Sequence, residues 1–277
     1  MNAPYLPQKF HNIHNICIEL VGLIEEFLTG EEYKSMRITS FQLDNGNLPD
    51  LNENFDAWEY LKDNNREGFI KLLNKNILLG LLSDFCYFIQ ESLEASSKMR
   101  LVVAYALLRR PLVDNLKILL NLLYNDSFYD KFISDDNFDS AQIEDKVLQE
   151  YLEGTDEIRL IKPIDGSSIY HFIFDKHNPI SVINLSNRAI HPVTTRPWNK
   201  TGVTNFNFMF VTMGDNYQLW DHYYAYLSPI LLFYVELFNS TIFGLFNDEI
   251  DGELMKSRIE RMAEIMSHGC DITNKNE

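Results

Sequence analysis

Apolar residues recur every three to four positions over several long stretches of the chain. In residues 11–28 they fall at Ile13, Ile16, Leu20, Leu23, Ile24 and Phe27. This spacing predicts an amphipathic helix with one buried face. Residues 67–94 and 97–124 are longer and apolar on most sides, which is typical of helices in the middle of a bundle. Because these two segments follow each other almost directly, we expect them to be antiparallel neighbours.

Prolines and caps mark where the remaining helices begin, bend or end. Pro111 removes a backbone donor inside the second long segment, so a kink or break is expected near residues 107–110. Asn178 and Pro179 form a typical start for a helix over residues 179–191. Residues 215–247 form the last long helix, with a bend expected at Pro229, and residues 248–266 form an amphipathic terminal helix.

The patterns of two segments do not clearly predict a helix. Residues 156–175 predict either a hairpin around Asp165 and Gly166 or a loop that leads into a short helix. Within residues 203–213, phenylalanines alternate with other residues, which favours a short strand. We therefore expect a mainly α protein, an antiparallel bundle of long helices with a small β-hairpin or strand in these two regions. No linker composition divides the chain, which predicts a single helical domain over residues 1–277.

The charge balance narrows the classes of partner. The chain has 24 basic and 40 acidic residues and a net charge of −16. Such a protein is repelled by phosphate backbones and anionic lipids, so binding of nucleic acid needs a local basic patch. Residues 229–246 are nearly long enough to span a membrane, but Glu236 and Asn239 favour a buried helix instead. The N-terminus lacks the pattern of a signal peptide. We expect a cytoplasmic, acidic protein that does not bind membranes.

The first candidate site is the basic stretch around the proline of the second long segment. Arg109 and Arg110 precede Pro111, and Asp114 follows Arg110 at the spacing of an ion pair on one helix face. One interpretation is an anion-binding site, where guanidinium groups and backbone groups freed by the proline meet a ligand. The alternative is that these cations pair with the surplus carboxylates of the chain.

The second candidate site is the segment that ends at His191. Asn187, Arg188 and His191 lie within one helical turn, and Arg188 and His191 share a face. Histidine carries protons near neutral pH and arginine stabilises a developing charge on phosphate. This set would suit cleavage of a phosphodiester without a metal. The alternative is a helix terminus at which His191 caps the last carbonyls.

Motifs for metals and cofactors are absent from the sequence. The three cysteines form no CxxC pair, and HExxH, Walker A, GxGxxG and GxSxG patterns do not occur. We therefore expect no metal ion and no cofactor. Cys86 lies in an apolar run and is expected in the core.

Two stretches resemble a known group of proteins. They are AYALLRRPLVDNLKILLNLLYN (104–125) and LSNRAIHPVTT (185–195). Together they resemble uncharacterised bacterial all-helical proteins that are loosely HEPN-like, over residues 65–245. The resemblance implies an antiparallel helical bundle that is often dimeric. Active HEPN members are metal-independent ribonucleases of toxin–antitoxin and antiphage systems, with an arginine and a polar residue four to six positions ahead of a histidine.

This chain departs from the HEPN motif. Arg188 precedes His191 with two residues between them, and Ser186 stands where the commoner arginine would be. Only His191, Arg188 and Asn187 carry over. Two hypotheses follow. The first is a non-catalytic interaction protein of a bacterial defence or regulatory system, which binds a protein partner or forms a homodimer. The alternative is a HEPN-like, metal-independent ribonuclease that uses the His/Arg pair, and RNA is a partner only in that case.

Overall fold

The computed structural model describes residues 5–40, 56–191 and 213–270, and within these ranges the chain is mainly α with no strand. The predicted bundle of long helices is confirmed. Its helices are α1 (His11–Thr29), α2 (Lys34–Arg37), α3 (Ala57–Asn64), α4 (Arg66–Ser97), α5 (Leu101–Arg109), α6 (Asn115–Tyr124), α7 (Phe128–Ser134), α8 (Asp145–Ile158), α9 (Gly166–Ile173), α10 (Val182–Ile190), α11 (Met213–Leu245) and α12 (Gly252–Cys270).

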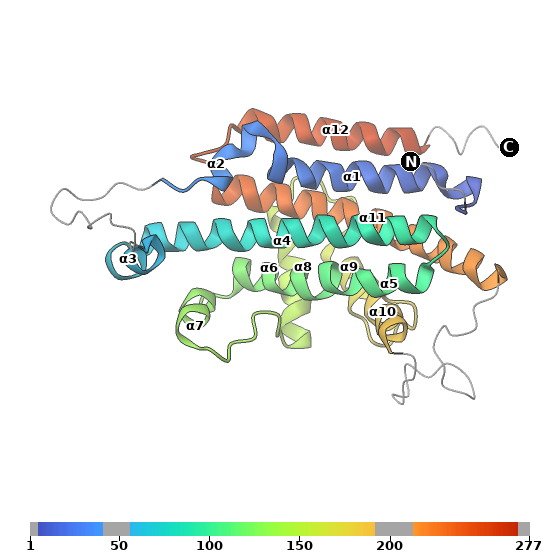
Figure 1. The fold of residues 1–277 in the computed structure, drawn as a ribbon, viewed down its shortest axis with the longest axis horizontal. Helices are drawn as coiled ribbons and strands as arrows, with labels where there is room; N and C mark the ends of the chain where they lie inside the picture. Colours follow the sequence, from blue (N-terminus) through green and yellow to red (C-terminus); the bar gives the residue numbers. More distant parts are fainter. Residues whose placement is uncertain (1–4, 41–55, 192–212, 271–277) are drawn as a thin grey trace.

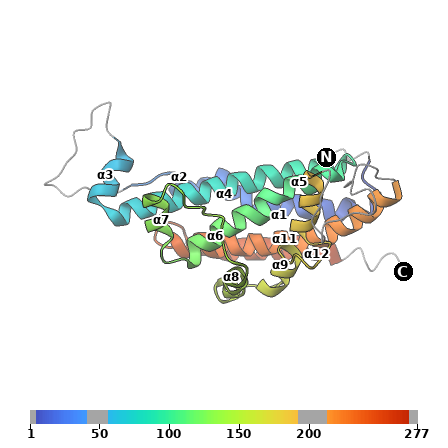
Figure 2. The same ribbon diagram turned by 90° about the horizontal axis from the view of Figure 1, so that it is seen from below.

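The long helices lie lengthwise and the short ones cross them. In Figure 1, α1, α4, α11 and α12 follow the long axis of the molecule, and α8 runs across them. Figure 2 shows α8 and α9 on one side of α11, with α4 on the other. Helix α11 therefore occupies the middle of the bundle.

Helix α11 supplies the centre of the main hydrophobic core. Its residues Leu231, Phe233 and Leu237 are fully or almost fully buried, and Tyr234 packs against Phe85 of α4 with ring centroids 4.6 Å apart. By length and composition alone, both α4 and α11 could cross a membrane, and 83% of the apolar window of α11 is buried inside the protein against 50% for α4. The apolar side chains of α11 are thus surrounded by other side chains of the protein.

The expectation that α4 lies in the middle of the bundle holds for only one of its faces. Its inner face contributes Leu82, Phe85 and Cys86 to the core, while Tyr87 on the outer face is 62% exposed. The sequence could not distinguish the two faces, because both carry large apolar side chains and the residues alone do not show which face lacks a neighbouring helix.

The junction between α4 and α5 is the tight antiparallel turn that the sequence predicts. Met99 adopts a left-handed conformation with φ of 61°, and the Arg100 N–H donates to the Ala95 carbonyl at 2.9 Å. This is the usual way for a helix to end when the chain reverses direction. The turn aligns α5 along α4 and places the basic stretch at the end of α5 beside α4.

Of the two alternatives for residues 156–175, the loop that leads into a short helix is confirmed and the hairpin is wrong. This segment holds the end of α8, a connection and α9. Asp165 is the N-cap of α9 and accepts a hydrogen bond from the Ser168 N–H at 2.7 Å. Gly166 fits close α8–α9 packing, since a Cβ atom there would lie 2.0 Å from the Leu152 carbonyl oxygen. The strand expected in residues 203–213 falls outside the described residues, except for Met213, which begins α11.

Candidate functional site

A single π-helical turn, Arg110–Asp114, replaces the kink expected at Pro111. The Asn115 N–H donates to the Arg110 carbonyl, five residues back, so the chain accommodates one extra residue and continues into α6. The turn changes which side chains share a face. Arg109 and Asp114, five residues apart, lie 3.9 Å from each other between Nε and Oδ2.

The predicted pairing of Arg110 with Asp114 is therefore wrong. Arg110 instead donates from Nε to Oδ2 of Asp84 at 2.7 Å, and its guanidinium lies 5.3 Å from the ring centroid of Phe88. Asp84 and Phe88 belong to α4, so Arg110 ties α5 to the outer face of α4. For Arg110 the structure therefore shows the alternative given above, in which the cation pairs with a carboxylate elsewhere in the chain.

Tyr234 satisfies the backbone of the π-helical turn. Its buried hydroxyl lies 3.1 Å from the Pro111 carbonyl oxygen and 3.2 Å from the Leu112 carbonyl oxygen, and its single proton is shared between them. The turn frees carbonyls from the regular ladder of hydrogen bonds, and an unpaired buried carbonyl is costly. Tyr234 thus joins the central helix to the one irregular turn beside the candidate site.

We expect Tyr234→Phe to lower the free energy of unfolding by about 1–2 kcal/mol, because two buried carbonyls lose their donor while the ring is kept. The measurement is urea unfolding followed by circular dichroism. Tyr5→Phe serves as the control, since Tyr5 is 61% exposed. A loss for Tyr234→Phe no larger than for the control would contradict the role of this hydroxyl.

Helix α10 places the second group of predicted residues across α5. The Asn187 side-chain oxygen accepts a hydrogen bond from Arg109 Nη1, so the structure brings Arg109, Asp114 and Asn187 together. Arg188 donates from Nη2 to the Pro179 carbonyl oxygen, and burial lowers the pKa of its guanidinium. His191 is exposed, directly after the last residue of α10, and its N–H donates to the Asn187 carbonyl at 2.9 Å.

Two residues that the sequence did not single out complete this region. The Tyr105 hydroxyl lies 3.0 Å from the Leu219 carbonyl oxygen and 3.0 Å from Nδ1 of His222. Burial and, to a lesser degree, the positive charge of Arg188 lower the pKa of His222 to about 4. The imidazole is therefore neutral at neutral pH. The four-residue spacing of Tyr105 and Arg109 on α5 is the signal that could have indicated a shared face.

The charged groups of the site make contacts within the chain. Arg109, Arg110 and Arg188 each bond to a group of this chain, and His222 is neutral at neutral pH. In the described part of the chain, no group of three or more His, Cys, Asp or Glu residues could hold a metal ion.

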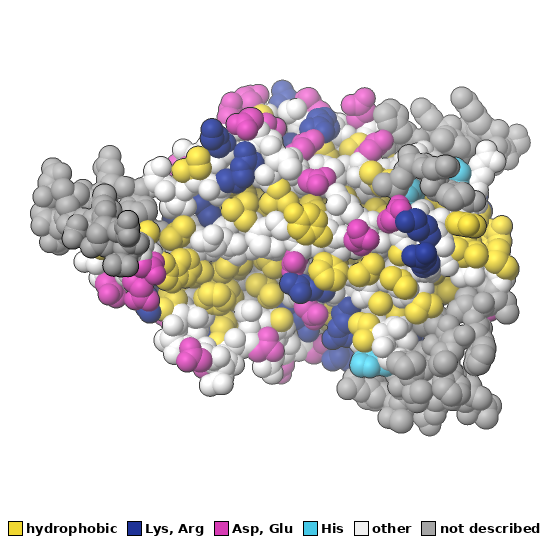
Figure 3. All heavy atoms as spheres, viewed as in Figure 1, with side chains coloured by type: hydrophobic (Ala, Val, Ile, Leu, Met, Phe, Trp, Pro, Cys, Tyr) yellow, Lys and Arg dark blue, Asp and Glu magenta, His cyan; other side chains and the backbone are white. Residues whose placement is uncertain are grey.

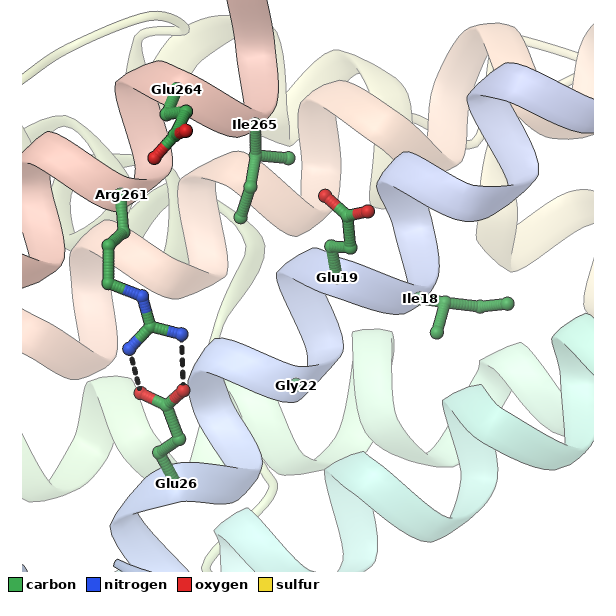
Figure 4. A pocket seen from close by; sticks show the side chains of 7 residues that line it. All are labelled: Ile18, Glu19, Gly22, Glu26, Arg261, Glu264 and Ile265. Carbon is green, nitrogen blue, oxygen red and sulfur yellow. Dashed lines mark hydrogen bonds and ion pairs between the residues drawn. The ribbon is translucent and has the colours of Figure 1, made fainter. Parts of the chain in front are cut away.

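A groove lies elsewhere, between α1 and α12. It has a volume of about 440 Å³ and is drawn in Figure 4. Arg261 closes one end through two hydrogen bonds to Glu26, of 2.8 and 2.5 Å. The lining side chains are Ile18, Glu19, Gly22, Glu26, Arg261, Glu264 and Ile265. None of the predicted site residues belongs to this groove.

No protein-family model, curated protein or solved structure matches the chain.

Proposed function

We propose that the protein works by binding another protein molecule through the outer face of α4 and α5, without catalysis. The observation that carries the proposal is the exposure of large apolar side chains on this face. Tyr87 is 62% exposed and Val103 is 50% exposed, while Phe88 and Leu107 are half-buried beside them. In Figure 3, hydrophobic side chains run along the face over α4 and α5 with few charged ones between them.

The composition of this face fits an interface. Extended apolar patches on a soluble protein mark sites of interaction, and the anchors of protein interfaces are enriched in tyrosine and arginine. Tyr87 and Arg110 are both present, and the guanidinium of Arg110 lies over the ring of Phe88. The surplus negative charge of the chain disfavours an anionic membrane as the partner.

The proposal is tested by exchanging apolar for charged side chains on the face. Full-length wild type and the double variant Tyr87→Glu, Val103→Glu are used as baits in an extract of the source organism. We expect a partner that the wild type retains and the variant loses. Leu160→Glu is the matched control, because Leu160 is 63% exposed but lies outside the face. The same proteins on wild type and double variant would contradict the proposal.

The ribonuclease hypothesis has one specific observation in its favour, the contact between Arg109 of α5 and Asn187 of α10. The test is cleavage of structured and single-stranded RNA by wild type and by His191→Ala, without added metal. Because the arginines of the site are bonded within the chain, we expect no cleavage above background from either protein. If the wild type cleaves RNA and His191→Ala does not, the proposed interaction function is wrong and the protein is a ribonuclease.

A further inference from the structure

One stripe of α4 faces outward along the apolar face. Gly80, Asp84 and Tyr87 are spaced by four and three residues and therefore lie on the same side of the helix. Only half of the apolar window of α4 is buried inside the protein, whereas 83% of that of α11 is. The hydrophobicity of α4 is thus not accounted for by the core of this chain.

Gly80 has no explanation within the chain. It is exposed in the middle of α4, and a Cβ atom placed on it would meet no other atom within 4 Å. A glycine inside a helix destabilises it by roughly 1 kcal/mol relative to alanine. Glycine on a helix surface allows another helix to approach closely. Its place on the apolar stripe indicates that the object approaching is outside this chain.

We propose that the partner is a second copy of this chain, and that α4 pairs with the α4 of that copy in an antiparallel arrangement. This inference rests on the proposed function. When the two-fold axis passes between Ser83 and Asp84, Tyr87 of each protomer stands over the partner's Gly80. A large ring then fills the space that the glycine leaves, once on each side of the axis, as an isologous interface requires.

The charges beside the axis fit the same arrangement. Asp84 is 30% exposed and Arg110 is 58% exposed, and the two form a pair on the face. Arg110 uses Nε and Nη2 on its own Asp84, which leaves Nη1 to donate to the partner's Asp84. In the antiparallel pair the two Asp84 side chains lie close to the axis, and the Arg110 beside each of them supplies the opposite charge. The face is therefore complementary to itself, although the chain as a whole carries −16.

The decisive experiment is a charge exchange measured by sedimentation velocity on the full chain. We expect a dimer for the wild type, and a dissociation constant raised roughly tenfold or more in Asp84→Arg and in Arg110→Asp. In the first variant each protomer brings two cations to the axis, and in the second each protomer brings two acids. An equimolar mixture of the two is expected to form a heterodimer, because each supplies the charge that the other lacks.

Gly80→Leu tests the close approach separately. Within the monomer the added side chain enters open space, so the thermal unfolding temperature is expected not to fall, while the dimer is lost. Gly22→Leu is the matched control, because Gly22 of α1 also has open space around its Cβ position but lies in the α1–α12 groove. This control is expected to leave the dimer intact.

Three results would overturn the inference: a monomeric wild type at about 100 µM, no heterodimer in the mixture, or an unchanged dimer in Gly80→Leu. The failure of the inference can be told from the failure of the proposed function. If the wild type is monomeric but the double variant Tyr87→Glu, Val103→Glu still loses a partner, the face binds a different protein and the interaction function stands.

Discussion

Replacing Arg258 by methionine is expected to lower the free energy of unfolding by about 2–4 kcal/mol, the largest effect of a single polar substitution that this structure indicates. Arg258 of α12 is 2% exposed. Its guanidinium donates to Asn239 Oδ1 of α11 at 2.8 Å and to Glu26 Oε2 of α1 at 3.1 Å, and it lies 3.9 Å from the ring centroid of Phe27. Methionine keeps the apolar stem and removes the donors. Asn239 of α11 and the Leu23 carbonyl of α1, which also accepts from Arg258, then lose their partner, while Glu26 keeps Arg261.

Arg261→Met is the matched control for this prediction. Arg261 also lies on α12 and bonds to the same Glu26, but its side chain is 50% exposed. We expect a loss of at most about 1 kcal/mol there, since exposed ion pairs contribute little. Urea unfolding gives both values, and hydrogen exchange of α12 amides shows whether the helix detaches. Equal losses for the two variants would mean that burial of Arg258 does not matter.

The long helices could be predicted from the sequence because the spacing of apolar residues shows which face of each helix is packed. The 3.6-residue period locates α1 and the antiparallel pair α4 and α5, and these elements appear as expected. Helix α10 begins at Val182 rather than at Pro179. The N-cap of α10 is Ser181 and not Asn178. Buried Asn184 donates to the Asn178 carbonyl at 2.8 Å and holds the residues before the helix in a turn.

The candidate site was predicted only in part, because it depends on contacts between distant segments. The pairs Arg109–Asn187 and Arg110–Asp84 join residues 78 and 26 positions apart, and no local spacing indicates them. The π-helical turn also shifts the register, so the i+4 rule assigned Asp114 to the wrong arginine. Pro111 signalled an irregularity, but the sequence does not show whether a helix breaks or inserts one residue there.

The same reasoning explains why the sequence does not indicate the proposed interaction face. An apolar helix in a sequence can be covered by its own chain or by another molecule, and the pattern of residues is the same in both cases. In our proposal the residue that separates them is Gly80, because it is exposed on the same side of α4 as Tyr87, and this exposure becomes visible only in the folded chain.

Acidification from pH 6.5 toward pH 4 is expected to lower the free energy of unfolding through buried histidines. Burial, which outweighs the opposing effect of Glu94, lowers the pKa of His14 to about 4 from its ordinary value of 6.5. His14 is 2% exposed, and its Nδ1 lies 2.8 Å from the Tyr224 hydroxyl. Between these two pH values the unfolded chain binds a proton that the folded chain does not. Stability is therefore full above pH 6.5 and falls as pH decreases, by up to about 1.4 kcal/mol per pH unit for each such histidine.

His14→Leu isolates this contribution, because Tyr224 keeps its hydrogen bond to Ser96 Oγ, of 3.0 Å, when the imidazole is removed. Urea unfolding at a series of pH values between 6.5 and 4.5 is expected to give a shallower decline for His14→Leu than for the wild type. Exposed His177 offers the matched control, and His177→Asn is expected to keep the wild-type slope. A slope in His14→Leu equal to that of the wild type would show that burial does not lower the pKa of His14 below its value in the unfolded chain.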